Sequence, residues 1–552
     1  MKKTLLLLLL LTALTNCKQQ PLTQVEKLAA TAKIWGFLKY YHPEVGKGTY
    51  NWDKQLFKVL PKIEKATTKE ELSQVYLDWI ASLEKVESCS SCYEKSSSNY
   101  FGKNFDLSWT QDELLFTKEL SRQLQFIENN RFQGNHHYVS HHNLIGNIEI
   151  RNEPDYKDFD WKDKKLRMLA LFKYWNIIEY FFPYKYQTDD DWDLVLQQFI
   201  PKFLSPATEQ EYHLTMLELV VKINDTHAGL VTPLTSDYFG IKRIPSKFKI
   251  IANKAILTRF YNDSLAQKDD LQIGDVITKV NGKPIAEILE EKKPYINASN
   301  ASVRLRNYSH AIFNGSTDSV HIDFDRNGKS YHKFIKRYTF NEFNYKKPSP
   351  KKWKILDDHI GYVNMGVLEK KDVPAMMDSL FTTKAIIFDI RNYPRKTMHS
   401  IAEYLNKVPK EFVMITIPDL RYPGKFVWTT PHSCGKNNGK EYTGKVVLLV
   451  NEQTQSHAEF TTMCLQTSIN ATVIGSQTSG ADGNISTIEF VGGFKTVMTG
   501  IGIFYPSGKE TQRIGIVPDI EITPTIEGIR KGKDEVLDKA IAFINTTKSN
   551  ID

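Results

Sequence analysis

Ser456 follows an apolar run and begins a segment of helical character, which is a position where a serine can act as a nucleophile. The run is 446–450, and the polar residues 451–455 separate it from Ser456. A serine at such a turn holds its oxygen outward, and the free amides at the helix start can bind an oxyanion. The alternative is that the hydroxyl only caps the helix. The adjacent His457 is a poor base, because successive side chains of a helix do not face each other.

A histidine from elsewhere in the chain is therefore expected as the base, and His227 is a candidate. It ends the run Asn224-Asp225-Thr226-His227, and the small residues Ala228 and Gly229 after it leave the imidazole accessible. Together, Ser456 and His227 would catalyse acyl transfer through a covalent intermediate. The alternative is that His227 is structural or merely exposed.

Strands and helices that alternate from residue 351 onward must position Ser456. Continuous apolar runs predict buried strands at 360–363, 385–390, 446–450 and 471–474. This pattern is typical of an α/β sheet with both faces covered, in which catalytic residues lie in loops beyond the strand ends. The loops 389–396 and 451–456 are therefore the candidate site loops.

An internal repeat with an offset of 140 residues lies in the N-terminal part. Thirteen identities across 48 aligned positions, without a gap, include two pairs of tryptophans, Trp35 with Trp175 and Trp52 with Trp192. Apolar residues recur at helical spacing in each copy. We predict a duplicated helical module, with residues 17–150 as the first copy and a linker. Residues 151–235 are the second copy, which carries His227.

Residues 243–340 are rich in short β-branched and aromatic runs separated by turns. Gly274-Asp275 and Asn281-Gly282 predict tight turns on either side of an apolar strand. The stretch 271–285 resembles the signature of PDZ domains of bacterial proteases. Such domains bind extended peptide by adding it to a sheet edge.

The order of these segments is similar to that of the tail-specific (C-terminal-processing) and tricorn-type serine peptidases. The resemblance covers about residues 220–540, and it depends on the ordered combination of motifs. After the helical region and the PDZ-like segment come 389–392, 451–460, 473–484 and 515–520. The resemblance implies a multidomain α+β fold in which residues 351–545 form an α/β, crotonase-like layered peptidase domain. It also implies a polypeptide substrate and no cofactor.

The resemblance gives roles to particular residues. Ser456 maps to the nucleophile and His227 to the general base, with Thr226 where the tricorn branch has a serine. Ala481 stands where the tail-specific branch has its lysine, which disfavours a Ser/Lys dyad. The glutamate of the tricorn branch maps to Gln512, so either the nearby Glu510 replaces it or the site is neutral. The oxyanion hole is expected from the amides of His457 and Arg395, and supporting positions are expected for Asp482, Asp389 and Glu459.

The predicted reaction is hydrolysis of peptide bonds in extended or unfolded polypeptides. His227 would deprotonate Ser456, and water would release the acyl-enzyme. The alternative is a non-catalytic, lipid-anchored protein that binds peptide or another ligand on a degenerate peptidase fold. Ala481, Gln512 and Arg395 favour this alternative, because each departs from one of the family patterns.

The first residues predict export. Lys2 and Lys3 precede seven consecutive leucines, and the stretch ends at Cys17. This resembles a bacterial lipoprotein signal, in which residues 1–16 are removed and Cys17 is lipidated. We expect a protein anchored to the cell envelope. The alternative is an ordinary secreted protein with a chance cysteine.

Composition limits the remaining classes of function. A chain of 552 residues suggests three or four domains, and a net charge of +8 from 72 basic and 64 acidic residues does not indicate nucleic-acid binding. Cys89-x-x-Cys92 and His432-x-Cys434 could supply metal ligands, but a disulfide is at least as plausible after export. We expect no metal.

Overall fold

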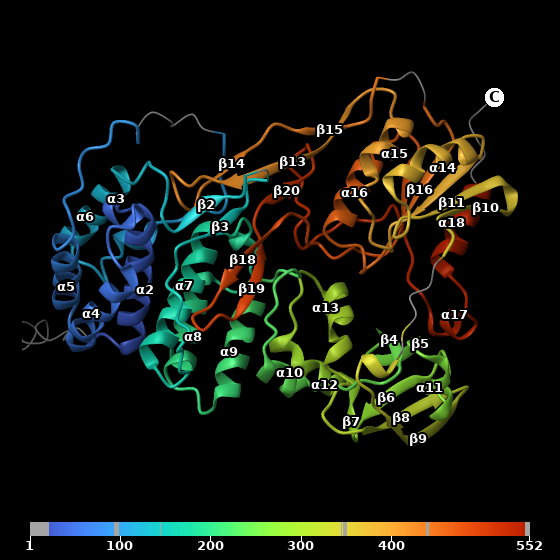
Figure 1. The fold of residues 1–552 in the computed structure, drawn as a ribbon, viewed down its shortest axis with the longest axis horizontal. Coiled ribbons are helices and arrows are strands. Elements are labelled where there is room, and N and C mark those ends of the chain that lie inside the picture. Colours follow the sequence, from blue (N-terminus) through green and yellow to red (C-terminus); the bar gives the residue numbers. More distant parts are fainter. Residues whose placement is uncertain are drawn as a thin grey trace, which may run out of the picture.

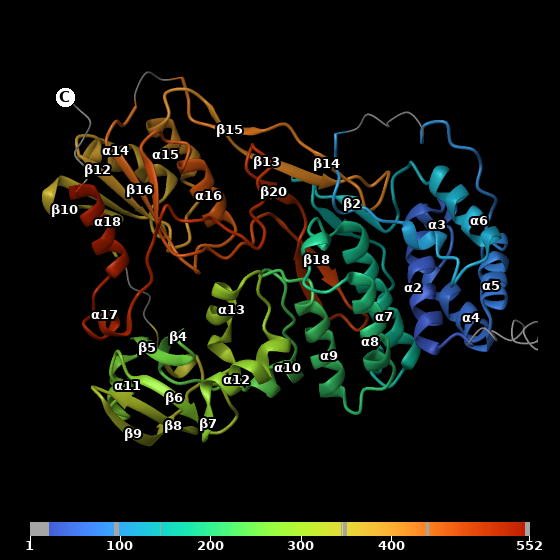
Figure 2. The same ribbon diagram turned by 180° about the vertical axis from the view of Figure 1, so that it is seen from behind.

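The computed structural model describes residues 21–92, 99–143, 145–343, 345, 350–437 and 441–546. The expected signal peptide 1–16 and Cys17 lie outside these residues, so lipidation stays a prediction. Within the described ranges, no helix is both long enough and apolar enough to cross a membrane. Figures 1 and 2 show an N-terminal helical part, a small β unit and a C-terminal α/β part as three lobes.

The two copies of the repeat form equivalent helices. The first copy contains α2 (Gln24–Tyr41), α4 (Trp52–Lys65) and α5 (Lys69–Ala81), and the second contains α7 (Lys164–Phe181), α8 (Trp192–Leu204) and α9 (Glu209–Val221). In each copy two buried tryptophans exchange hydrogen bonds. The indole of Trp52 donates to the carbonyl of Trp35 at 2.9 Å, and that of Trp175 donates to the carbonyl of Trp192 at 2.8 Å. The repeated tryptophans therefore fix the same helix–helix contact twice.

Ion pairs exchanged between the copies hold the two modules together. Lys33 of the first copy lies 2.6 Å from Asp193 of the second, and Lys173 of the second lies 2.7 Å from Asp53 of the first. Both pairs join the same two repeat positions. The copies are thus related by an approximate two-fold axis.

Gly36 and Asn176 occupy equivalent positions beside this axis. The Asn176 amide donates to the carbonyls of Ala32 and Phe172, both at 2.9 Å, and these two residues are also equivalent in the repeat. A Cβ on residue 36 would overlap the Asn176 side chain. Only one of the two positions can therefore carry a side chain.

Smaller elements complete the N-terminal part. They are α3 (Pro43–Gly46), α6 (Lys118–Asn129), α10 (Pro233–Phe239), β1 (Tyr100–Phe101), β2 (Val139–His141) and β3 (Ile148–Ile150). Strands β2 and β3 form an antiparallel hairpin, and its turn lies at the functional site described below.

The β unit is an antiparallel sheet with the strand order β4-β5-β6-β8-β9 and a short β7 on β6. Its strands are β4 (Ser246–Ile251), β5 (Lys254–Phe260), β6 (Val276–Val280), β7 (Lys283–Pro284), β8 (Ser319–Arg326) and β9 (Lys329–Lys336). Its helices are α11 (Asp263–Lys268), α12 (Ile285–Lys292) and α13 (Ala301–Asn307). Strand β4 is at one edge of the sheet. That the unit is a PDZ domain stays a prediction.

The C-terminal part is built on a sheet with the order β10-β11-β12-β16-β17-β21, in which only β10 is antiparallel to its neighbour. The strands are β10 (Trp353–Leu356), β11 (Ile360–Asn364), β12 (Ala385–Asp389), β16 (Lys445–Val450), β17 (Ala471–Gly475) and β21 (Ile520–Glu521). The helices are α14 (Val373–Leu380), α15 (Met398–Leu405), α16 (His457–Leu465), α17 (Ile526–Arg530) and α18 (Glu535–Thr546). The four predicted buried strands are confirmed.

Alternate residues of the central strands pack into different cores. Ile386 and Phe388 of β12 pack in the cluster that contains residues of α14, α15 and α16, whereas Ile387 packs in the cluster that contains residues of α18. Both faces of the sheet are therefore covered, as the continuous apolar runs predict. The name crotonase-like for this layering stays a prediction.

Two further groups of strands join the lobes. A second sheet contains β13 (Lys410–Pro418), β14 (Phe426–Trp428), β15 (His432–Cys434) and β20 (Gly502–Phe504), and β1 of the N-terminal part pairs with β14. The hairpin of β18 (Ile485–Glu489) and β19 (Lys495–Thr499) lies beside the N-terminal helices (Figure 1). Phe490 stacks on Tyr174 of α7, and Phe494 contacts His213 of α9. This contact brings the end of β19 to the loop that carries His227.

Candidate active site

A cavity of about 1700 Å³ lies where the N-terminal helical part meets the C-terminal α/β part. Ser456 and His227, which are 229 residues apart in the sequence, both line it. His457, Arg395 and Asp482 line the same cavity. The structure therefore brings together five of the residues predicted for the site.

Ser456 is the residue at which strand β16 and its loop turn into helix α16. Its backbone has φ 55° and ψ −125°, whereas ordinary N-cap residues have extended backbone. A non-glycine residue in this conformation is strained and persists only where its surroundings fix it. A strained serine on a sharp strand-to-helix turn is also the geometry of known nucleophilic serines.

Glu459 fixes this turn. Its buried carboxylate accepts hydrogen bonds from the amides of Ser456 at 3.1 Å, Gly480 at 2.8 Å and Ala481 at 3.1 Å, and from the hydroxyl of Thr478. Burial raises the pKa of the Glu459 carboxyl above its usual value, and the four hydrogen bonds oppose that shift. Glu459 thus ties the start of α16 to the loop after β17, and its supporting role in catalysis stays a prediction.

Two other residues that line the cavity, His457 and Arg395, have backbone amides that could bind an oxyanion. His457 is the first residue of α16, and Arg395 lies in the loop after β12. Within the described part of the chain, neither amide has a hydrogen-bond acceptor. This arrangement is compatible with the predicted oxyanion hole, and the role of each amide stays a prediction.

His227 is oriented by two partners that the sequence analysis did not assign. Its Nδ1 lies 2.9 Å from Oγ1 of Thr499 and 3.4 Å from Oδ1 of Asp225. Asp225 is buried, accepts the amide of His227 at 3.0 Å and accepts the amide of Thr499 at 2.6 Å. The carboxylate therefore holds the histidine loop and the end of β19 in one network.

The network around His227 favours the ionised form of the Asp225 carboxyl. Burial alone would raise its pKa, but the hydrogen bond and charge interaction with His227 and the amide hydrogen bonds lower the pKa below its usual value. A buried carboxylate beside a histidine stabilises the imidazolium that forms when the histidine takes a proton. Asp225 lies two residues before His227 in the same polar run, whereas nothing in the sequence indicates Thr499.

Thr226, which stands where the tricorn branch has a serine, makes its side-chain hydrogen bonds to Ser299. Its hydroxyl donates to Oγ of Ser299 at 2.9 Å and accepts the amide of Ser299 at 2.9 Å. Its own amide also donates to Ser299 Oγ, at 2.8 Å. The structure thus directs Thr226 toward the β unit.

Glu510 is not at the cavity either. Its carboxylate accepts hydrogen bonds from Lys103, Tyr186 and Gln187 at 2.7–3.0 Å. Gln512 is buried, and its side-chain nitrogen and oxygen have no hydrogen-bond partner among the described residues. The register shift that would have brought Glu510 to the site is therefore wrong, because three other side chains hold its carboxylate elsewhere.

Asp389 serves the loop that follows it. Its carboxylate binds the guanidinium of Arg391 through both oxygens, at 2.9 and 2.7 Å, and accepts the hydroxyl of Tyr362 at 2.8 Å. Arg391 is held in turn by Asp534 at the start of α18. Asp389 thus fixes the start of the loop 390–396, and its supporting role at the site stays a prediction.

Asp482 is buried in the loop after β17. Its Oδ1 accepts the amide of Gly483 at 2.7 Å, and its Oδ2 has no partner in the part of the chain that the structure describes. Burial, together with the charge of Glu459, raises the pKa of Asp482 well above its usual value. The folded protein therefore binds a proton on the Asp482 carboxyl more tightly than the unfolded chain does.

The free energy of unfolding is consequently expected to fall as the pH rises from about 4, the usual pKa of an Asp carboxyl, through the raised pKa of Asp482. Over this range the folded state binds a proton at Asp482 that the unfolded chain has already lost. Asp482→Asn removes the buried charge and is expected to gain about 1–3 kcal/mol over the wild type at pH 8, but little at pH 4. Chemical unfolding at several pH values measures this. Asp378→Asn, at an exposed position of α14, is the matched control. The same pH dependence in wild type and Asp482→Asn would contradict the assignment.

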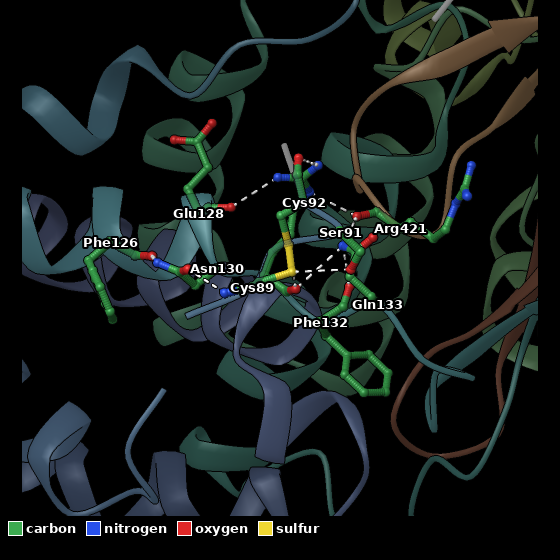
Figure 3. Close-up of a disulfide and its surroundings, with 10 residues drawn as sticks. Cys89, Ser91, Cys92, Phe126, Glu128, Asn130, Phe132, Gln133 and Arg421 are labelled. Carbon is green, nitrogen blue, oxygen red and sulfur yellow. Dashed lines mark hydrogen bonds between the residues drawn. A yellow bond between two sulfur atoms is a disulfide. The ribbon is translucent and has the colours of Figure 1, made fainter. Parts of the chain in front are cut away.

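The four described cysteines are one disulfide-bonded pair and two free thiols. Cys89 and Cys92 are joined by a disulfide, and the amide of Cys89 donates to Asn130 at 2.8 Å (Figure 3). Cys434 and Cys464 are free and buried. No group of three or more metal-binding side chains occurs among the described residues, and the expectation that the protein needs no metal stays a prediction.

Comparison with known proteins gives the same family for the C-terminal part. The model of peptidase family S41 matches residues 359–522. A Chlamydia trachomatis protein named only "Protein" is 34% identical over 103 residues, which are 18% of this chain and 17% of that protein. The chain thus matches about a sixth of the length of this curated relative.

Solved structures of CPAF share the fold. Mature CPAF in complex with lactacystin has a TM-score of 0.55 at 14% identity, over 70% of this chain and 99% of CPAF. A serine-to-alanine variant of CPAF has a TM-score of 0.56 at the same identity and coverage. Within this shared fold, residues 359–522 are the part that matches the model of peptidase family S41.

Proposed function

We propose that the protein is a serine endopeptidase that hydrolyses extended or unfolded polypeptides through an acyl-enzyme on Ser456. The observation that carries this proposal is the shared cavity: a serine on a strained turn and a histidine held by a buried carboxylate both line it. The match to peptidase family S41 supports the same chemistry.

The mechanism follows from the contacts of His227. Thr499 and Asp225 lie at Nδ1, which leaves Nε2 to accept the proton of Ser456. The serine oxygen attacks the peptide carbonyl, and the amides of His457 and Arg395 stabilise the oxyanion. His227 then gives the proton to the leaving amine. Water, deprotonated by the same histidine, hydrolyses the acyl-enzyme.

The cavity wall supports an apolar side chain next to the cleaved bond. Ile415 pairs directly with Ile503 across β13 and β20, so both lie on one face of the sheet. Ile417 lies two residues further along β13 and so shares that face, and Ile501 directly precedes β20. Phe460, one turn after Ser456 on α16, also lines the cavity with these four isoleucines. Such a wall favours aliphatic and aromatic side chains.

The turn of the β2–β3 hairpin bounds the cavity on another side. Asn147 donates to the carbonyl of Ile485 at 2.9 Å and to the hydroxyl of Ser486 at 3.2 Å, which fixes the turn against β18. Gly146 approaches Ile417 so closely that an added Cβ would contact it at 2.9 Å. A site bounded in this way favours an extended segment of polypeptide.

A fluorophosphonate probe and a peptide library test the proposal. We expect covalent labelling of Ser456, located by mass spectrometry of the digested protein. We also expect cleavage of peptides with Ile, Leu or Phe at the bond, at least tenfold faster than of peptides with Asp or Lys there. A folded protein that neither reacts with the probe nor cleaves any peptide would disprove the peptidase assignment.

The second candidate function is a lipid-anchored protein that binds peptide or another ligand without cleaving it. The observation that favours it is Gln512, which has an amide in place of the family's carboxylate, with both of its polar atoms unpartnered among the described residues. Asp225 reduces the weight of this observation, because it supplies a carboxylate beside His227 from another position. Binding of peptide without labelling of Ser456 would favour this second function.

Two further parts of the proposal concern where the substrate first binds and where the enzyme is located. We infer that the β unit is PDZ-like and that an extended polypeptide adds to its edge strand β4 before cleavage. We also infer export and lipidation of Cys17, which would anchor the enzyme to the cell envelope. The basic and leucine-rich residues 2–11 support this localisation.

A further inference from the structure

Residues 297–306, here called the bridging segment, connect α12 to α13 in the β unit and run through α13. The segment contacts the histidine loop at one end. Ser299 exchanges three hydrogen bonds of 2.8–2.9 Å with Thr226, the residue next to His227, and Asn297 donates to the carbonyl of Thr226 at 2.8 Å. Ser299 is 1% exposed, so these bonds are shielded from water.

The other end of the bridging segment contacts both loops around Ser456. Arg306 donates to the carbonyl of Glu452 at 2.7 Å, to the hydroxyl of Ser479 at 3.0 Å and to the side-chain oxygen of Gln455 at 2.8 Å. Gln455 is the residue before Ser456. Burial lowers the pKa of Arg306 to about 10, so its guanidinium remains charged at neutral pH.

Asn300 adds a second contact on the same side. Its amide donates to the carbonyls of Thr478, Ser479 and Arg513 at 2.9–3.2 Å. Thr478 also binds Glu459, the carboxylate that fixes the turn at Ser456. In Figures 1 and 2, α13 lies between the β unit and the C-terminal part, where these contacts occur.

Ser456 and His227 belong to different lobes, so their spacing depends on contacts between lobes. Thr499 provides one such contact through Asp225 and His227, and the bridging segment provides another. We propose that the bridging segment is a positioning element that sets the distance between Ser456 and His227, with Arg306 and Ser299 as its positioning residues. The β unit is then part of the catalytic apparatus.

This inference rests on the proposed function, because spacing matters for proton transfer from Ser456. A misplacement of about 1 Å between reacting groups costs roughly 10²-fold in rate. Arg306→Ala is therefore expected to lower kcat about 10- to 100-fold with KM changed less than about threefold. Arg306→Lys keeps the charge but loses the planar fork, and it is expected to recover only part of the loss.

Steady-state cleavage by the full chain measures these values. Ser299→Ala tests the other end of the segment and is expected to lower kcat in the same way. Arg326→Ala is the matched control, since this arginine pairs with Asp270 and Asp275 inside the β unit. Equal losses of kcat in Arg306→Ala and Arg326→Ala would overturn the proposal, and so would wild-type kcat in Arg306→Ala.

Hydrogen exchange gives a readout that does not need activity. Arg306→Ala is expected to speed amide exchange in 451–456 and 478–481, and Ser299→Ala is expected to speed it in 224–228. Faster exchange in these loops, in a protein that the fluorophosphonate probe does not label, would support the positioning role of the bridging segment. The absence of labelling would at the same time contradict the proposed peptidase function. Unchanged exchange at both loops would overturn the bridge, whatever the activity.

Discussion

Alanine in place of Ser456 is expected to lower kcat for peptide cleavage by about 10⁴- to 10⁶-fold and to abolish fluorophosphonate labelling. The oxygen that forms the acyl-enzyme is lost, whereas the amides and the cavity that bind the peptide remain. Peptide affinity is therefore expected to change little. Cleavage assays and a binding titration with the same peptide measure the two effects separately.

The matched control for Ser456 is Ser379→Ala, at an exposed position of α14 in the same domain. It is expected to leave both kcat and labelling unchanged. Retention of more than about a tenth of the wild-type kcat by Ser456→Ala would exclude Ser456 as the nucleophile. Without the serine oxygen no acyl-enzyme can form on residue 456, and binding contacts alone do not supply that step.

Alanine in place of His227 is expected to lower kcat by a similar factor, about 10⁴- to 10⁶-fold, and to slow labelling. The serine hydroxyl is a weak nucleophile without a base that takes its proton. The backbone amides of residue 227 and Thr499 would still donate to the Asp225 carboxylate, so the fold is expected to persist. His321→Ala, on β8 in the β unit, is the control and is expected to react like the wild type.

Asp225→Asn separates orientation from charge in the same network. Asparagine keeps the shape, but it does not stabilise the imidazolium and can select the wrong tautomer of His227, so kcat is expected to fall about 10²- to 10⁴-fold. Gln512→Ala is expected to cost much less, because Asp225 provides the carboxylate beside His227. A larger loss of kcat in Gln512→Ala than in Asp225→Asn would instead assign the orientation of His227 to Gln512.

Local patterns in the sequence predict much of the C-terminal part. Continuous apolar runs identify β11, β12, β16 and β17, since buried parallel strands need apolar residues on both faces. The strand-to-helix turn at Ser456 follows from the polar loop between β16 and α16. The paired tryptophans of the repeat likewise mark equivalent helices, because each pair makes the same contact.

Contacts between distant segments could not be predicted in the same way. Thr499 reaches His227 because the β18–β19 hairpin packs on α7 and α9 through Phe490 and Phe494, and no local pattern encodes that packing. The resemblance to the tricorn branch, with a small shift in register from Gln512, made Glu510 a candidate for the site. Its carboxylate is instead bound by side chains from residues 103–187, which are more than 320 positions away.

The two-fold relation of the helical copies makes the N-terminal part comparable to a homodimer fused into one chain. Covalent linkage gives the two halves a high effective concentration, so their association does not depend on protein concentration. The exchanged pair of Lys173 and Asp53 is almost fully buried, and removal of the second copy would leave the Asp53 carboxylate without the charge of Lys173. The first copy, which carries no histidine equivalent to His227, thus contributes packing and ion pairs to the half that does.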